Sequence, residues 1–286
     1  MSDAAPVVWA YWEDGPRRSR SAYLDLCLET LEHHAAPLEL RVLSRPDTPS
    51  WLPDLDVERW EALPAPNFRS DYARSRVLQR YGGVWVDVDT IALAPLSRLI
   101  DEIDEIGMVC FGKEQGRFFG GLCAAAPGTP FVDAWVQGQD RMLDRHPDLT
   151  TLPYAGLAQD VTWELARRLP WKALPMQRVA PVPWYQWRRF FSRLESPRRV
   201  VGPATVTVVL WNAVMAPHLR DRSRAELLRS RMLLCRLLRI GLGMSDILGE
   251  DDALTRLHAL SSARFSGPGQ RLESGARRIL RRRSAR

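Results

Sequence analysis

Two aspartates separated by one residue, Asp87 and Asp89, are the side chains of this sequence best suited to chemistry. They end the segment Val84-Trp85-Val86-Asp87-Val88-Asp89, which begins apolar and is predicted to be a strand. Alternate residues of an extended segment point to the same face, so we expect the two carboxylates to lie together. Hard dications such as Mg²⁺ and Mn²⁺ typically take one or two carboxylates plus substrate phosphates. The spacing therefore indicates a metal site, although an isolated D-x-D pair is also common at solvated strand ends.

A third acidic residue, Asp71, opens the helix that is predicted just before this strand. Ser70 is expected to cap it, and Gly82-Gly83 to end it, because glycine accepts the left-handed conformation at a helix C-terminus. Arg74 follows Asp71 by about one turn, so the two side chains share a helix face. A helix-start acid in a surface ion pair would explain them equally well. Their spacing ahead of the glycines and the D-x-D pair favours a site.

The surrounding pattern alternates strands and helices. Strands are predicted at residues 7–12, 38–43, 84–89, 106–111, 120–126 and 205–211, and helices at 19–34, 71–81, 131–143, 159–169 and 224–243. This order predicts an α/β fold with a mixed sheet flanked by helices and a helical extension at the C-terminus. Ligands of such sheets gather at the carboxyl ends of strands, which is where Asp87 and Asp89 fall.

A longer pattern joins these residues, S-D-x-x-R-x-x-x-L-x-x-x-G-G-x-x-x-D-x-D from Ser70 to Asp89. It resembles the DXD sugar-binding region of glycosyltransferase family 32, which includes capsular polysaccharide synthesis proteins, α-1,4-glycosyltransferases and mannosyltransferases. More loosely, Val7–Trp12 is similar to the family's first strand, and Pro127-Gly128-Thr129-Pro130-Phe131 to its helix-opening P-G-x-P-F segment.

The resemblance implies a GT-A fold and a metal-dependent transfer of sugar from a nucleoside-diphosphate sugar, with retained anomeric configuration. Mn²⁺ or Mg²⁺ would be the cofactor, and a glycan, a lipid-linked sugar or a small molecule the acceptor. The implied residues divide by role. The catalytic set is Asp71, Arg74 and Asp89; the donor-binding set is Trp9, Tyr11, Asp71, Arg74 and Asp87; and the metal set is Asp87, Asp89 and Asn212.

Each role is specific. Asp71 would accept hydrogen bonds from donor sugar hydroxyls, and Arg74 would contact the sugar or its phosphate. Asp89 would bind the metal directly, whereas Asp87 would bind the ribose or hold the metal through water.

The sequence departs from the family pattern near its later strand. Family members often carry a histidine in an H-L-W-N-like segment that completes the metal site, but this chain has Val209 there, followed by Leu210-Trp211-Asn212. Asn212 could supply a neutral oxygen ligand or could simply cap a loop. Gly120-Gly121 stands where members often have an asparagine. The departures keep open a catalytically silent protein that binds sugar nucleotides.

An aromatic and basic cluster follows this core. Its rings could stack on sugars in an acceptor cleft, or form a lid or packed core. The cluster consists of Trp184, Tyr185, Trp187, Phe190 and Phe191 with Arg188 and Arg189.

The net charge of +6 has its main source at the C-terminus, where residues 264–286 carry eight arginines and one glutamate. With no recognisable nucleic-acid module beside it, this tail favours an anionic membrane surface over nucleic acid, which we do not expect as a partner. The helix predicted at 224–243, with arginines flanking leucines, could join that contact or pack on the core.

We therefore predict a glycosyltransferase domain over residues 1–222, a helical extension over 223–260 and a basic tail over 261–286. The four cysteines lack a CxxC pair and the N-terminus does not resemble a signal peptide, so we expect reduced thiols and a cytoplasmic protein. Membrane contact would place it at the inner face of the membrane.

Overall fold

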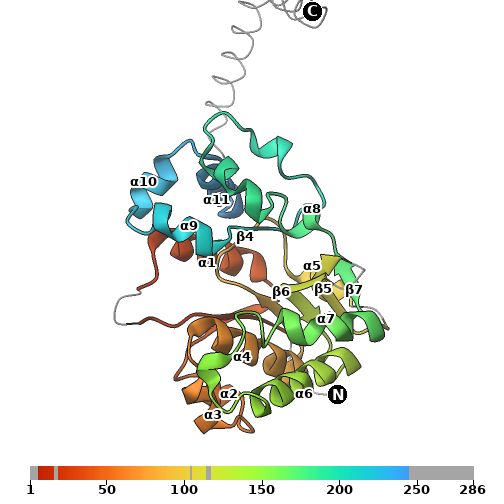
Figure 1. Cartoon of the computed structure of the whole chain (residues 1–286). Helices are drawn as coiled ribbons and strands as arrows, with labels where there is room; N and C mark the ends of the chain where they lie inside the picture. The colour runs from red at the N-terminus through yellow and green to blue at the C-terminus, as the bar shows by residue number, and fades with distance from the viewer. Residues whose placement is uncertain (1–5, 16–18, 104, 114–116, 245–286) are drawn as a thin grey trace, which may run out of the picture. The chain divides into compact units, whose positions relative to one another are not determined.

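A mixed six-stranded sheet forms the centre of the structure (Figure 1). The computed structural model describes residues 6–15, 19–103, 105–113 and 117–244. Within them the strand order is β2-β1-β3-β6-β5-β7, and β4 and β8 form a separate antiparallel pair. The strands are β1 Val7–Tyr11, β2 Glu39–Leu43, β3 Gly83–Val86, β4 Thr90–Ala92, β5 Met108–Lys113, β6 Arg117–Ala125, β7 Lys172–Leu174 and β8 Thr207–Val209.

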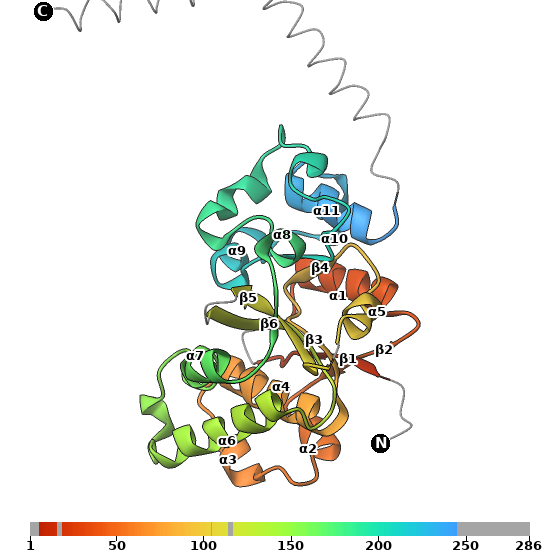
Figure 2. The same ribbon diagram turned by 90° about the vertical axis from the view of Figure 1, so that its right-hand side faces the viewer.

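Helices cover both faces of this sheet (Figures 1 and 2). One face packs against α2 Thr48–Trp51, α3 Val57–Ala62, α4 Pro66–Tyr81, α6 Pro130–Asp144 and α7 Gln159–Arg168. The other face packs against α1 Ala22–Ala35, α5 Ser97–Asp101 and α8 Met176–Val179. Short 3₁₀ helices lie at η1 Leu149–Thr151, η2 Trp184–Phe191 and η3 Pro197–Arg199. The predicted α/β class, a mixed sheet flanked by helices, is confirmed.

Alternation along the central strands divides the core between the two faces. In β1, Trp9 and Tyr11 belong to the cluster under α4 and α6, whereas Val8 and Ala10 belong to the cluster under α1. In β3, Trp85 faces the first cluster and its neighbours face the second. Burial on both sides explains why these strands are almost wholly apolar.

A third cluster joins the C-terminal helices to the sheet domain. It packs α9 Asn212–Leu219, α10 Arg224–Arg229 and α11 Leu233–Gly241 against α1 and β8. The single helix predicted at 224–243 is therefore wrong, because Ser230 ends α10 in an extended conformation and a new helix begins at Leu233. Leucines of α11 are fully buried, so this helix packs on the core and offers no apolar face to a membrane.

The helix before the D-x-D pair begins earlier than predicted. Ser70 lies inside α4, and its predicted role as the cap is wrong, since Ala65 is the N-cap and Pro66 occupies the first turn. Proline is preorganised for that position because its φ angle is already helical. The predicted end is confirmed: Gly82 caps α4 with a φ of 65°, and a Cβ on Gly83 would lie 2.2 Å from the Val7 carbonyl oxygen.

Two cysteines also differ from expectation. The antiparallel register of β5 and β6 places Cys110 opposite Cys123, and the structure joins them as a disulfide. The expectation of reduced thiols is wrong for this pair, because it considered sequence spacing and not strand pairing. Cys27 and Cys235 are free and buried.

The described residues, which end at Met244, belong to one compact unit. The predicted basic tail, and residues 245–260 of the predicted extension, lie outside the described residues. In the part that is described, no helix combines the length and apolar character that crossing a bilayer requires.

Candidate active site

A cavity of about 600 Å³ lies where β1 and β3 end. Residues from α4, from the β3–β4 turn and from the start of α9 line it, together with the segment before α7. The walls of the cavity thus come from α4, which packs on one face of the sheet, and from α9, which packs in the third cluster, and they meet at the carboxyl edge of the two parallel strands. Six of the seven predicted site residues line it, namely Tyr11, Asp71, Arg74, Asp87, Asp89 and Asn212, and Trp9 does not.

The D-x-D pair lies in the turn after β3 and not within a strand. β3 ends at Val86, and the Asp87 backbone N–H donates to the Gly121 carbonyl of β6 at 2.9 Å. Asp87 Oδ1 accepts hydrogen bonds from Arg74 Nη2 at 2.8 Å and from Trp85 Nε1 at 2.9 Å. The expectation that both carboxylates point from one face of a strand is therefore wrong, and the turn gives each its own neighbours.

Asp89 is held from the opposite side of the turn. Its Oδ2 accepts the Asn212 backbone N–H at 2.6 Å, and its backbone carbonyl accepts the Leu210 N–H at 2.8 Å. Burial, followed by the negative charge of Asp87, raises the pKa of Asp89 to about 6. Charge on the carboxylate is thus costly here, and a cation would relieve that cost.

Arg74 lies between two carboxylates. Its Nη1 is 3.2 Å from Asp71 Oδ1, its Nη2 contacts Asp87, and its guanidinium lies over the Trp85 ring. The Arg74 side chain is only 4% exposed. Burial raises the pKa of Asp71 to about 6 despite this contact. Arg74 therefore orients Asp71 and Asp87 before any ligand is bound.

The cavity can accept a dication. Asp71, Asp87 and Asp89 surround it, and Arg74 is the only cationic side chain among its described lining residues. Asp87 is engaged by side-chain hydrogen bonds through Oδ1, and Asp89 accepts the Asn212 N–H through Oδ2. No group of three or more His, Cys, Asp or Glu side chains suited to a metal occurs among the residues described. These donors fit a hard cation that substrate phosphates complete, not an all-protein cage.

The late strand contributes no ligand side chain. Val209 is buried in β8 opposite Thr90 and belongs to the core. Asn212 lies beside Asp89, but its Oδ1 already accepts a hydrogen bond from the buried Tyr23 hydroxyl. Its established contribution to Asp89 is thus the backbone N–H.

The first strand contributes Tyr11 and Glu13. The Tyr11 hydroxyl donates to Glu13 at 2.6 Å, and Arg69 of α4 binds both Glu13 carboxylate oxygens. Burial alone would raise the pKa of Glu13, but hydrogen bonds from Arg69 and Tyr11 outweigh it and lower that pKa. Glu13 was not among the residues predicted from the sequence, although its position just after an apolar strand was a signal for it. Trp9 is buried instead, donates to the Gly82 carbonyl and packs on Trp51 and Tyr81.

Two backbone features beside the aspartates were also missed. Trp211 has a left-handed conformation, with φ of 59°, which directs the Asn212 N–H toward Asp89. This conformation is uncommon for a bulky residue and marks a locally constrained site. Gly121 is needed for space, because a Cβ there would lie 2.9 Å from Asp87 Oδ2.

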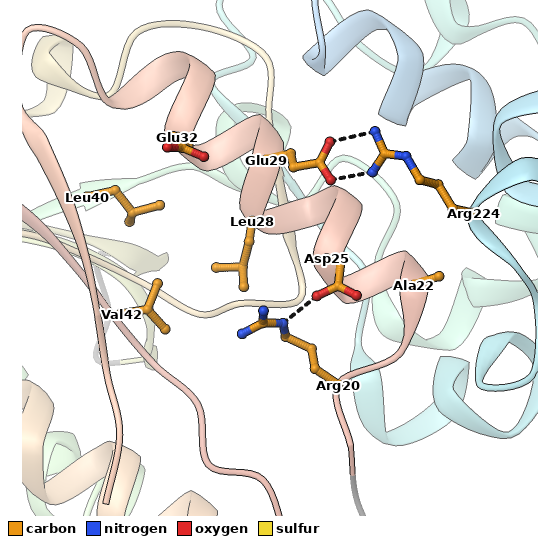
Figure 3. Close-up of a pocket in the computed structure, with 9 residues that line it drawn as sticks. All are labelled: Arg20, Ala22, Asp25, Leu28, Glu29, Glu32, Leu40, Val42 and Arg224. Atoms are coloured by element: carbon orange, nitrogen blue, oxygen red, sulfur yellow. Dashed lines mark hydrogen bonds and ion pairs between the residues drawn. The ribbon is translucent and has the colours of Figure 1, made fainter. Parts of the chain in front are cut away.

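A second cavity, of about 480 Å³, lies between α1 and the edge strand β2 (Figure 3). Its charged groups are largely satisfied by ion pairs: Arg20 binds Asp25, and Arg224 of α10 binds both carboxylate oxygens of Glu29. These pairs fasten α1 to its neighbours. The cavity by the aspartates is therefore the better candidate for catalysis.

Known proteins resemble the segment that carries this site. Residues 10–107 match the family model described as the glycosyltransferase sugar-binding region containing a DXD motif. Lactosylceramide 4-alpha-galactosyltransferase of Rattus norvegicus is 26% identical over 214 residues, which are 70% of this chain and 56% of the relative. The same-named protein of Pongo pygmaeus is 27% identical over 195 residues, 62% of this chain and 81% of the relative. The chain thus spans just over half the length of the rat protein.

Two solved structures show similarity to the chain. The galactosyltransferase LgtC has a TM-score of 0.44 at 12% identity, over 83% of this chain and 96% of that chain. The PaToxG glycosyltransferase has a TM-score of 0.39 at 13% identity, over 84% of this chain and 78% of that chain. The resemblance to DXD glycosyltransferases that the sequence indicated is confirmed by the family match over residues 10–107.

Proposed function

We propose that this chain, whose residues 10–107 match the sugar-binding region of DXD glycosyltransferases, transfers a sugar from a nucleoside-diphosphate sugar to an acceptor. One observation carries the proposal: Asp71, Asp87 and Asp89 converge with Arg74 on one cavity at the strand ends. The carboxylates that line this cavity outnumber its single guanidinium, so their net negative charge repels a free diphosphate and donor binding requires a dication. Mn²⁺ or Mg²⁺ is the proposed cofactor.

The aspartates divide the work. Asp89 and Asp87 would hold the dication, with Asn212 supporting Asp89 through its N–H. Asp71 accepts hydrogen bonds from hydroxyls of the donor sugar. Arg74 acts as a positioning residue that holds Asp71 and Asp87, because both its terminal nitrogens already contact them. When bound, the dication supplies electrostatic stabilisation to the leaving diphosphate.

The proposed transfer retains the anomeric configuration. The anomeric carbon–oxygen bond to the diphosphate breaks, and the acceptor oxygen bonds to that carbon on the same face. The leaving phosphate oxygen takes the acceptor proton, so the protein need not supply a base. No side chain of the cavity has to act as the nucleophile in this scheme.

Donor-dependent stabilisation tests the function. UDP-, GDP- and dTDP-sugars, including galactose donors because the relatives are named galactosyltransferases, would be screened with and without Mn²⁺. At least one donor should raise the melting temperature only with the metal, since binding to the native state alone stabilises it. Asp89→Ala should abolish this rise and donor hydrolysis, whereas the exposed Asp101→Ala should change neither. Neither stabilisation nor turnover with any donor would contradict the proposal.

A silent sugar-nucleotide binder is the second candidate. Val209 favours it, because the strand that could supply a further metal ligand supplies a buried apolar side chain. Metal-dependent donor binding with no hydrolysis or transfer under Mn²⁺ or Mg²⁺ would select this function.

We further propose that the protein works at an anionic membrane surface on lipid-linked acceptors, as in capsule or other polysaccharide biosynthesis. The arginines of residues 264–286 support this. Deleting these residues should reduce co-sedimentation with anionic liposomes. Added salt should likewise reduce the co-sedimentation of the full-length protein. Unchanged co-sedimentation of the deletion variant would contradict the membrane role.

A further inference from the structure

Two aromatic side chains that line the cavity are largely exposed. Tyr154 is 78% exposed and Trp184 is 60% exposed, whereas Trp60, Trp85 and Trp135 are completely buried. Both exposed rings line the same cavity as the aspartates. Exposing large aromatic rings to water is unfavourable. Such rings beside a cavity therefore indicate a surface that a ligand covers during function.

Both rings stand on anchored segments. Tyr154 lies between the buried Leu152 and Leu157, in a turn that the Gly156 N–H closes by donating to the Pro153 carbonyl at 2.8 Å. Trp184 opens η2, which the fully buried Phe190 fastens to the third cluster. The two segments precede α7 and follow α8, which cover opposite faces of the sheet (Figure 1). Tyr154 and Trp184 therefore line the cavity from segments anchored in different parts of the core, the first and the third cluster.

Several lining residues of the cavity carry neutral hydrogen-bonding side chains. Gln159 follows Tyr154 at the start of α7, and Asn67 and Ser70 line the wall formed by α4. Aromatic faces combined with neutral hydrogen-bonding groups suit a pyranose ring, which has an apolar C–H face and a rim of hydroxyls.

We propose that Tyr154 and Trp184 form a stacking platform that binds the acceptor, and that the acceptor is a neutral saccharide end. The proposal rests on the transferase function and adds its acceptor class. The negative charge of the cavity disfavours an anionic acceptor sugar. The donor is a dianion and the dication balances it, so the surplus negative charge of Asp71, Asp87 and Asp89 over Arg74 persists in the loaded cavity.

Saturation-transfer NMR of saccharides with the full-length protein tests this. The neutral probes are lactose, maltose and methyl α-mannopyranoside, and the anionic probe is 3′-sialyllactose. Each would be measured with Mg²⁺ and the nucleoside diphosphate of the donor that stabilises the protein. At least one neutral probe should bind, and the anionic probe should bind at least about tenfold more weakly.

Variants then locate the binding. Tyr154→Ala and Trp184→Ala should each weaken the neutral probe about tenfold, and Trp184→Phe should restore most of it. Trp163→Ala is the matched control, because Trp163 is 41% exposed but does not line the cavity. Metal-dependent stabilisation by the nucleotide should be unchanged in all four variants, which shows that they fold and keep the donor site.

The outcomes separate the two proposals. Absence of donor-dependent stabilisation in the wild-type protein contradicts the transferase function itself. Donor stabilisation without binding of any neutral probe, or with equal binding of sialyllactose, overturns only the acceptor platform. Equal losses in Trp163→Ala and Trp184→Ala would overturn it as well.

Discussion

The buried guanidinium of Arg74 shapes the chemistry of individual residues in this site. It neutralises part of the charge of Asp71 and Asp87 and fixes their orientation, at 3.2 Å and 2.8 Å respectively. We expected Arg74 to contact the donor; in the structure its terminal nitrogens contact the carboxylates of Asp71 and Asp87. Removing such a buried partner leaves uncompensated charge, which typically costs about 3–5 kcal/mol. Arg74 therefore matters for folding as well as for donor binding.

Asp71→Asn should stabilise the ligand-free protein at pH 7.5. Burial raises the pKa of Asp71 to about 6, above its usual value near 3.8, so the folded state holds the proton more tightly than the unfolded chain. That stabilising contribution is present at low pH and is lost as the pH rises through about 6. Asparagine resembles the protonated form, so the variant should gain about 2 kcal/mol in the free energy of unfolding at pH 7.5.

Urea unfolding of both proteins between pH 4 and 8 measures this, and the difference should vanish near pH 4. The same substitution should weaken metal-dependent donor stabilisation, because the neutral amide of asparagine accepts hydrogen bonds from the donor sugar more weakly than the Asp71 carboxylate does. A variant that is equally stable at every pH would show that Asp71 is not strained by burial.

The β3–β4 turn is the element that positions Asp87 and Asp89 in the site. Hydrogen bonds from three separate parts of the chain hold this turn. The Gly121 carbonyl of β6 binds the Asp87 N–H, and the N–H groups of Leu210, just after β8, and of Asn212, at the start of α9, bind Asp89. Each contact reaches the turn across a large sequence separation, 123 residues for Asn212 and Asp89. The geometry of the carboxylates thus depends on strand pairing more than on the D-x-D spacing.

Gly121→Ala should reduce donor affinity at least tenfold without unfolding the protein. The new Cβ would lie 2.9 Å from Asp87 Oδ2, and the end of that side chain can move aside. The loss of stability should stay near 1 kcal/mol, as for mild overpacking. Gly202→Ala is the control, because nothing lies within 4 Å of its added Cβ. Thermal shifts with donor and Mn²⁺ measure both effects, and a wild-type donor response in Gly121→Ala would refute the steric argument.

At the scale of the whole molecule, the site depends on the packing of the C-terminal helices. α11 contacts α1 and β4, and its buried leucines complete the third cluster. β4 in turn follows directly from the D-x-D turn. A domain that ends at residue 222, as the sequence suggested, would expose this cluster.

Two truncations test that consequence. A chain of residues 1–244 should fold and keep metal-dependent donor stabilisation, because it contains the compact unit and the whole cavity. A chain of residues 1–222 should unfold or aggregate, since fully buried side chains such as Leu233, Leu237 and Leu238 are removed. Circular dichroism and thermal melts would compare them. Equal stability of the two chains would support the earlier boundary.

The local sequence pattern was sufficient to predict much of the secondary structure and the acidic residues of the site. The apolar strands, the glycine stop of α4 and the positions of most helices follow from periodicity and from the φ angles that glycine allows. Asp71, Asp87 and Asp89 stood out for the same reason, since their spacing relative to the glycines lies within one short segment.

Only tertiary structure decided what these residues meet. The partners of Arg74, the pairing of Cys110 with Cys123, the space at Gly121 and the burial of Trp9 all depend on strand register and on layers that bring distant segments together. Residue type and spacing specify which chemistry is available. The long-range packing of the sheet and its helices specifies which groups face one another, because those contacts join residues far apart in the chain.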